Sequence, residues 1–347
     1  MTSRAFLPLK LRKTPLYDLH AEQGGTFSPW RGQEIASHYE SILDEHASAN
    51  DALALFDLGY RSFIRLEGLD ASRLLNRLAT MDVDGMPTSA LCELPLVYPD
   101  GTLAELVKLS REKDKAWLMI FENRDAAKVL TWFRQEAEGC ECWIDDISQQ
   151  YAWIGLSGAR AMDYLSCSAP TLTNLKPFSM TEALVSGVAA RIWRVEDNFF
   201  EIACQPELLA KIIRAWWSGS EHPVLCGWAS YENWRLEHGE LRDGFELKEG
   251  VTPFELGLDD KVDFEHAQLK HMLIHFTLAA MRLPRVQSPI FCAGKMVGFV
   301  CGGGFSVKLR CPIGSAWVNT DDVDFDQLEV EIRRQRFPLI VRKAPFA

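Results

Sequence analysis

Carboxylates gather in one irregular stretch of the chain and are the first candidates for binding chemistry. Glu240, Asp243, Glu246 and Glu249 follow Gly239, and glycine is the residue type favoured just past a helix end. A connection of about a dozen residues is uncommon unless it is functional or disordered. Ionised carboxylates accept hydrogen bonds and attract cations. We therefore predict an ordered segment that forms the wall of a binding site.

Helix signals lie on both sides of this segment. Residues 230–238 place apolar side chains at helical spacing, so a helix is expected to end at Gly239. Residues 252–255, T-P-F-E, have the form of a capping box, with Thr at the cap and Glu at the third position after it. A second helical element is therefore predicted where the carboxylate-rich segment ends.

Histidine and glycine clusters elsewhere are weaker candidates. His271 and His275, preceded by His266, are spaced for one face of a predicted helix, but the glutamate of a metalloprotease motif is missing. A solvated helix face is the favoured interpretation. Residues 302–304, G-G-G, lack the lysine of a phosphate-binding loop and are interpreted as a barrel turn.

Composition limits the kinds of protein this chain can be. Its 347 residues predict two or three domains, and 47% hydrophobic residues are enough to fill their cores. A formal charge of -11 argues against a nucleic-acid surface. No window approaches about 18 apolar residues, and the first residues do not resemble a signal peptide. We expect a cytoplasmic protein that does not bind membranes.

The cysteines fit such a protein. There are 9 of them, and most lie in apolar, strand-like surroundings, so buried thiols are expected and a disulfide framework is not. Cys140 and Cys142 lack the spacing of a zinc or redox pair and have no histidine nearby in the sequence. We predict no metal site in the chain.

Alternating patterns predict two similar α+β units. Residues 62–137 are interpreted as β-α-β-β-β-α, with a hairpin signal at residues 99–101, P-D-G. Residues 151–217 run through the same kinds of element, which suggests a diverged internal duplication. The spacing of apolar side chains from Ile35 to His46 indicates a helix before the first unit.

Short β-like runs dominate the chain after residue 258. They are expected at residues 281–283, 290–292, 296–301, 315–318 and 328–341. Glycine turns separate them, so this region is predicted to form a small barrel or sandwich.

Short segments along nearly the whole chain match one family in order and spacing. They are residues 14–20 (T-P-L-Y-D-L-H), 54–57 (A-L-F-D), 70–82, 235–237 (R-L-E), 251–258 (V-T-P-F-E-L-G-L) and 298–318. This set resembles the T-protein (aminomethyltransferase) of the glycine cleavage system and its folate-binding relatives. The resemblance implies an α+β fold, with antiparallel sheets and flanking helices in a duplicated folate-binding region, followed by a small C-terminal β-barrel.

Domain boundaries follow from this interpretation. We expect a folate-binding α+β domain over residues 1–55 and 150–265. An inserted α+β domain is expected over residues 56–149, and a C-terminal barrel domain over residues 266–347.

The resemblance also implies a cofactor and the residues that hold it. Tetrahydrofolate, or a one-carbon-substituted folate, is expected between the domains, where a fixed carboxylate recognises the pterin edge. Glu201, in F-E-I, resembles the family's pterin glutamate, and Trp193 falls near a family tyrosine. Arg235, Tyr231 and Tyr60 occupy the remaining expected cofactor-binding positions.

The reacting end departs from the family pattern. Where the family has an aspartate pair, this chain has Ala104 followed by Glu105, so Glu105 is the only carboxylate left as catalytic candidate. Neighbouring side chains in a strand point to opposite faces, so Glu105 does not simply replace a carboxylate at Ala104.

Two interpretations remain open. One is a one-carbon transferase that moves an aminomethyl or methyl unit, and the sequence leaves open whether a lipoyl carrier protein docks. The other is a non-catalytic folate-binding or scaffold protein that has lost the catalytic aspartate.

Overall fold

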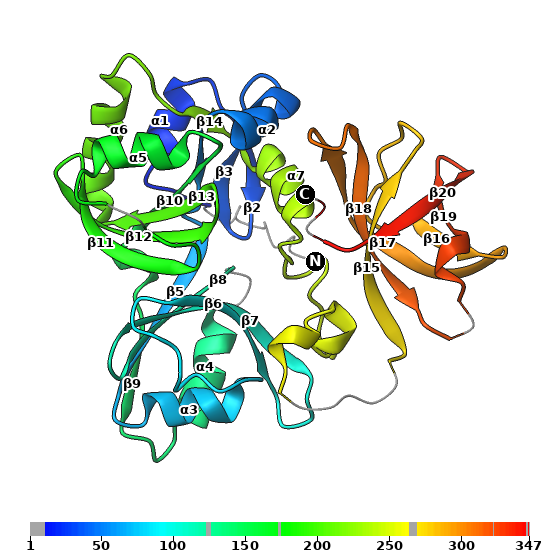
Figure 1. The fold of residues 1–347 in the computed structure, drawn as a ribbon, viewed down its shortest axis with the longest axis horizontal. Helices are drawn as coiled ribbons and strands as arrows, with labels where there is room; N and C mark the ends of the chain where they lie inside the picture. Colours follow the sequence, from blue (N-terminus) through cyan, green and yellow to red (C-terminus); the bar gives the residue numbers. More distant parts are fainter. Residues whose placement is uncertain are drawn as a thin grey trace, which may run out of the picture.

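The computed structural model describes residues 11–122, 126–172, 175–263, 269–321, 323–344 and 346. Two mainly antiparallel sheets with helices lie to one side of a central helix, and a closed barrel lies to the other (Figure 1). The fold is α+β, as predicted. None of the helices in these ranges is long and apolar enough to cross a membrane.

The first large sheet has the strand order β6-β7-β8-β5-β9, and all of its neighbouring strands are antiparallel. Its elements are β5 (Arg61–Gly68), α3 (Ala71–Leu78), β6 (Leu91–Val97), β7 (Leu103–Lys113), β8 (Ala116–Glu122), α4 (Ala126–Glu136) and β9 (Cys142–Asp146). The β-α-β-β-β-α order expected for residues 62–137 is confirmed, including the β6–β7 hairpin.

The second large sheet has the strand order β11-β12-β13-β10-β4-β14. Its elements are β4 (Ala54–Asp57), β10 (Ala152–Ser157), α5 (Ala161–Ser168), β11 (Ser179–Val185), β12 (Val188–Glu196), β13 (Phe199–Cys204), α6 (Pro206–Trp217) and β14 (Val224–Cys226). Strands β11-β12-β13-β10 repeat the order β6-β7-β8-β5 of the first sheet, each with a helix after its first strand. This common topology agrees with the predicted duplication.

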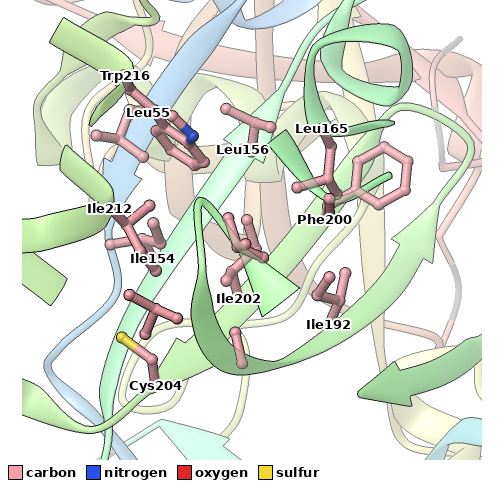
Figure 2. Packing of buried hydrophobic residues seen from close by; sticks show 14 of the residues in the cluster. Leu55, Ile154, Leu156, Leu165, Ile192, Phe200, Ile202, Cys204, Ile212 and Trp216 are labelled. Carbon is pink, nitrogen blue, oxygen red and sulfur yellow. The ribbon is translucent and has the colours of Figure 1, made fainter. Parts of the chain in front are cut away.

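Each sheet buries one face against helices. In the second sheet, Ile154, Phe200 and Ile202 contact a core that also contains Ile212 and Trp216 of α6 (Figure 2). Helix α6 forms because its apolar residues recur at helical spacing and Pro206 occupies its first turn. The side chains between these strand residues point to the opposite face, toward the other sheet.

The two sheets meet through an aromatic layer. Phe63, Trp153 and Trp193 form a stack, with ring centroids 4.0 Å and 4.6 Å apart for successive pairs. Phe199 belongs to the same buried cluster. Because Phe199 and Glu201 are on the same face of β13, the Glu201 carboxylate also points into the layer between the sheets.

The C-terminal region is a closed barrel with the strand order β15-β18-β17-β16-β19-β20. Its strands are β15 (His271–Leu278), β16 (Pro289–Cys292), β17 (Lys295–Ser306), β18 (Cys311–Asn319), β19 (Leu328–Ile332) and β20 (Gln335–Arg342). The predicted barrel is confirmed. The prediction of a strand at residues 281–283 is wrong, because this stretch is an irregular connection between β15 and β16.

Two further predictions for the barrel are also wrong. His271 and His275 lie on strand β15 and not on a helix, because pairing with β18 and β20 overrides the helical spacing. His266, the third histidine of this prediction, lies outside the described residues. Residues 302–304 continue strand β17 and form no turn, because they pair with β18. Glycine is required at Gly304, where a Cβ would lie 2.2 Å from Asn233 Oδ1 of the neighbouring helix. These glycines permit close packing of helix and barrel.

The N-terminal region contains a small sheet and two helices. They are β1 (Arg12–Lys13), α1 (Tyr17–Glu22), β2 (Thr26–Trp30), β3 (Gln33–His38) and α2 (Ile42–Asp51). The helix expected from Ile35 onward is wrong in its first half. Ile35 pairs with Ser28 in the small sheet, and the helix begins only at Ile42, after the Ser41 cap.

Helix α7 (Trp228–His238) occupies the centre of the molecule, between the sheets and the barrel (Figure 1). It ends at Gly239, whose φ of 73° is left-handed, as the sequence predicts. The capping-box bonds are present, because Thr252 N donates to Glu255 Oε2 at 2.8 Å and Glu255 N donates to Thr252 Oγ1 at 3.3 Å. The helix that follows is only the short 3-10 turn η2 (Phe254–Leu256).

Candidate functional site

A buried carboxylate lies at the centre of the candidate site. The Glu201 side chain is 0% exposed and pairs with the guanidinium of Arg61 on β5. Its other oxygen accepts a hydrogen bond from Trp153 Nε1 at 2.9 Å. Burial opposes ionisation of Glu201, but the charges of Arg61 and Lys108 outweigh it and lower the pKa of the carboxyl. Glu201 is therefore a charged anchor within the protein.

Lys108 of β7 and Glu240 form the accessible part of the same cluster. Lys108 Nζ lies 3.1 Å from Glu201 Oε1 and 2.8 Å from Glu240 Oε1. Both the Lys108 and Glu240 side chains are 21% exposed. Burial opposes the charge on Glu240, yet Lys108 and Arg61 lower its pKa to about 2. An ionised carboxylate beside an ammonium group thus faces the open side of the cluster.

Arg61 and Tyr231 hold Glu240 in place. Arg61 Nη2 donates to Tyr231 Oη at 2.8 Å and to Glu240 Oε1 at 3.2 Å. Tyr231 Oη donates in turn to Glu240 Oε2 at 2.5 Å. The four charged groups, which we call the Arg61–Glu240 cluster, are Arg61, Lys108, Glu201 and Glu240. They come from both sheets and from the segment after α7.

Two further carboxyl groups feel the charges of this cluster and bind protons more readily than usual. Glu196 Oε2 lies 3.5 Å from His238 Nε2. Burial, together with the charge of Glu240, raises the pKa of Glu196 to about 7. Burial also raises the pKa of Glu93, against the opposing charge of Lys261, which lies 3.8 Å away. A carboxyl with a pKa near 7 exchanges protons at neutral pH, as general acid–base chemistry requires.

Two of the predicted cofactor-binding residues are in the core. Trp193 is 0% exposed, and its Nε1 donates to Ser110 Oγ at 3.2 Å. Tyr60 is 1% exposed, and its ring lies edge-on to Trp228, with centroids 5.0 Å apart. Both support the packing around the site, and direct contact with a ligand stays a prediction for each.

Arg235 belongs to a second buried network on α7. Its guanidinium donates to Glu232 at 2.8 Å and to Glu246 Oε2 at 3.3 Å. It also donates to the backbone oxygen of Glu240 at 3.0 Å, which fixes the position of that residue. Glu246 is anchored from the other side by Ser315 Oγ of the barrel, at 2.5 Å. The carboxylate-rich segment is therefore ordered, as predicted, and it ties the helix to the barrel.

Glu105 is not part of the Arg61–Glu240 cluster. Glu105 is opposite Leu96 in the β6–β7 pairing, and Leu96 belongs to the core between the first sheet and its helices. The Glu105 side chain is therefore on the helix side of the sheet. Lys108 is an odd number of positions from Glu105 and Val107, so it is on the opposite face of β7 from that core. The structure thus places a lysine near the buried Glu201, whereas Glu105 is on the helix side of the sheet.

Sequence reasoning missed Arg61, Lys108, Glu240 and Glu196 as members of the site. Glu240 belongs to the carboxylate-rich segment, so part of the signal was present. Lys108 carries a weaker signal, because its even spacing from Ala104 along a predicted strand indicates a shared face. A register shift between Leu96 and Val97 interrupts that alternation in the structure. Arg61 meets Glu201 across 140 positions of sequence, and no local pattern indicates that contact.

Comparison with known proteins agrees with this architecture. A family model described as the GCVT N-terminal domain matches residues 16–266, and one for the glycine cleavage T-protein C-terminal barrel domain matches residues 272–347. The chain therefore belongs to the glycine cleavage T-protein family.

Relatives with assigned activities match over their full length. The aminomethyltransferase of Moorella thermoacetica is 28% identical and aligns over 97% of this chain and 98% of its own. The aminomethyltransferase of Bacillus subtilis is also 28% identical, and the alignment covers 97% of this chain and 99% of that protein. The crystal structure of glycine cleavage system aminomethyltransferase T from Bartonella henselae has a TM-score of 0.87 at 20% identity, covering 97% of this chain and 98% of its own. This last likeness shows the fold.

Proposed function

We propose that the protein is a tetrahydrofolate-dependent one-carbon transferase whose ligand-binding centre is the Arg61–Glu240 cluster. The observation that carries this proposal is the Lys108–Glu240 pair, which is accessible on one side and anchored to the fully buried Glu201 on the other. Full-length similarity to aminomethyltransferases supports the same reaction class.

The chemistry of the cluster fits a reduced pterin. A pterin has an amide and an amine that donate hydrogen bonds, and it needs a fixed, ionised acceptor. Glu240 supplies one, because its pKa of about 2 keeps it charged and Tyr231 holds its orientation. Glu201 acts indirectly, since its hydrogen bonds go to protein groups and fix Arg61 and Lys108. When bound, tetrahydrofolate supplies the nitrogen that carries the one-carbon unit.

Glu196 takes the proton-handling role that the sequence assigned to Glu105. Its pKa of about 7 leaves both protonation states populated at neutral pH. It also feels the charges of Glu240 and Lys108, which places it within electrostatic range of the cluster. A positioned carboxyl of this kind can accept or return a proton while a one-carbon unit is transferred.

Calorimetric titration with tetrahydrofolate and 5-methyltetrahydrofolate tests the proposal. We expect micromolar binding by the wild-type protein and about tenfold weaker binding by Glu240→Gln, which keeps the shape and removes the charge. Glu182→Gln is the matched control, because that carboxylate is 68% exposed on β11 and away from the cluster. Absence of saturable binding by the wild-type protein, or equal affinity of Glu240→Gln, would overturn the proposal.

A second candidate function is folate binding without group transfer, as a scaffold. The position of Glu105 favours it, because the carboxylate expected at the reacting end faces the helix side of the sheet. Assays of transfer from an aminomethylated lipoyl carrier protein and from a small methylated amine separate the two candidates.

The transferase proposal makes a specific claim about Glu196. Turnover in the wild-type protein should depend on pH around 7, and the Glu196→Gln variant should lose turnover while keeping folate affinity. Folate binding without transfer from either donor would favour the scaffold function.

A further inference from the structure

A second concave site lies where the segment after α7 meets the barrel. Its volume is about 500 Å³, and it is lined by residues 248–251 and by parts of β15, β17 and β18. It shares no residue with the Arg61–Glu240 cluster. The segment is held against the first sheet by a hydrogen bond from Leu103 N to Val251 O at 2.7 Å. The pocket is therefore built from ordered backbone on both sides.

Lys248 is the notable polar group in this pocket. Its ammonium lies 4.1 Å from the ring centroid of Phe299 and 4.6 Å from that of Trp317. Trp317 is fixed in turn, because its Nε1 donates to Glu246 O at 3.1 Å. Within the described part of the chain, Lys248 makes these ring contacts and no ion pair. A partly desolvated ammonium on aromatic rings attracts an anion.

The carboxylates beside Lys248 are already engaged. Glu249 pairs with Lys128 at 2.9 Å, and Glu255 accepts the backbone N–H of Thr252 at 2.8 Å. Their negative charges remain near the pocket, so a dianion such as phosphate is disfavoured relative to a monoanion. Across the pocket, His271 Nδ1 lies 3.0 Å from Asn319 Oδ1, so two hydrogen-bonding side chains line that wall.

The remaining wall is apolar. Met296, Val297 and Phe299 of β17 line it, and the Met296 side chain is 55% exposed. Thioether and ring carbons of this kind favour a flat hydrophobic body. A volume of about 500 Å³ is in the ordinary range for small-molecule sites, which are mostly apolar with a few placed polar groups.

We propose that this pocket binds a small aromatic monocarboxylate, with its carboxylate at Lys248 and its ring against Phe299 and Met296. This site is separate from the proposed folate centre and does not depend on it. Ligand-observed NMR and calorimetry with indole-3-acetate as the probe test the proposal. Its uncharged amide, indole-3-acetamide, is the matched ligand.

Saturable binding of indole-3-acetate, at least about tenfold tighter than that of the amide, is expected for the wild-type protein. The Lys248→Met variant keeps a chain of similar length and should lose this preference for the anion. The Lys308→Met variant is the control, because Lys308 is exposed on the barrel and outside the pocket. No saturable binding by the wild-type protein, or equal affinity in Lys248→Met, would overturn the proposal.

A second pair of variants protects the test against a folding defect at Lys248. Met296→Glu places a carboxylate on the exposed wall and should weaken indole-3-acetate binding through charge repulsion, whereas Met296→Gln should not. Equal affinities in this pair would contradict the proposed placement of the ligand. Tetrahydrofolate titrations of the same variants distinguish the two sites, because affinity for folate should be unchanged.

Discussion

The Arg61–Glu201 ion pair joins the two large sheets, so removing it should show how much the cluster stabilises the fold. The Arg61 and Glu201 side chains are 3% and 0% exposed, and breaking a buried pair from one side costs ~3–5 kcal/mol. Lys108 and Trp153 still contact Glu201 when Arg61 is removed. We therefore expect Arg61→Met to lower the free energy of unfolding by about 3 kcal/mol, the lower end of this range. Glu201→Gln should cost about as much, because it removes the carboxylate that neutralises both Arg61 and Lys108 and leaves Glu240 as the one carboxylate of the cluster.

The double variant distinguishes a true pair from two independent losses. In the double variant neither charge of the pair is left buried without its partner. Its loss in free energy of unfolding should therefore be about 3 kcal/mol smaller than the sum of the losses of the two single variants. Urea unfolding read by circular dichroism and by tryptophan fluorescence measures this, and coincident curves support a two-state comparison. The exposed Arg160–Glu221 pair, with side chains 58% and 44% exposed, is the control and should couple by less than about 1 kcal/mol. Additivity within about 0.5 kcal/mol for Arg61 and Glu201 would refute the reasoning.

Three further predictions concern single residues. Glu240 has a pKa lowered from 4.5 to about 2, so its stabilising contribution is complete above pH 4.5 and is lost as pH falls toward 2. Acid titrations of stability should therefore show a smaller loss for Glu240→Gln than for the wild type, and parallel curves would contradict this. Gly239→Ala should cost about 1–2 kcal/mol in urea unfolding, because φ is 73° and the new Cβ would lie 2.6 Å from the Cβ of Ala344. Glu105→Gln should leave folate affinity and turnover within about twofold of wild type, because the side chain faces away from the cluster; a large loss in steady-state assays would restore the catalytic role inferred from the sequence.

Local patterns were sufficient to predict most of the regular elements. Helix α6 has apolar residues at helical spacing after a proline, and the β6–β7 hairpin turns at P-D-G. The errors came where tertiary pairing decides between alternatives. His271–Leu278, H-M-L-I-H-F-T-L, is short and mostly apolar without strict alternation, and periodicity alone cannot assign such a stretch to strand or helix. The predicted domain boundaries stay a prediction.

The candidate site was only partly predictable, for a physical reason. Glu201 was found because a short motif surrounds it, and Glu240 lies in the carboxylate-rich segment. Lys108 contacts Glu201 across 93 positions of sequence and Arg61 does so across 140, so their partnership depends on how the two sheets face each other. In the sequence Glu196 looks like an ordinary strand-end carboxylate, and its pKa is raised to about 7 by burial and by the charge of Glu240, which no local pattern indicates.

A crystal structure with 5-formyltetrahydrofolate, a stable reduced folate, tests most directly whether the Arg61–Glu240 cluster is the ligand-binding centre. We expect the pterin amide and amine to lie within hydrogen-bond distance of the Glu240 carboxylate, with Lys108 beside it and Glu201 still bound to Arg61. A folate bound elsewhere in the molecule, with the Lys108–Glu240 pair untouched, would contradict it.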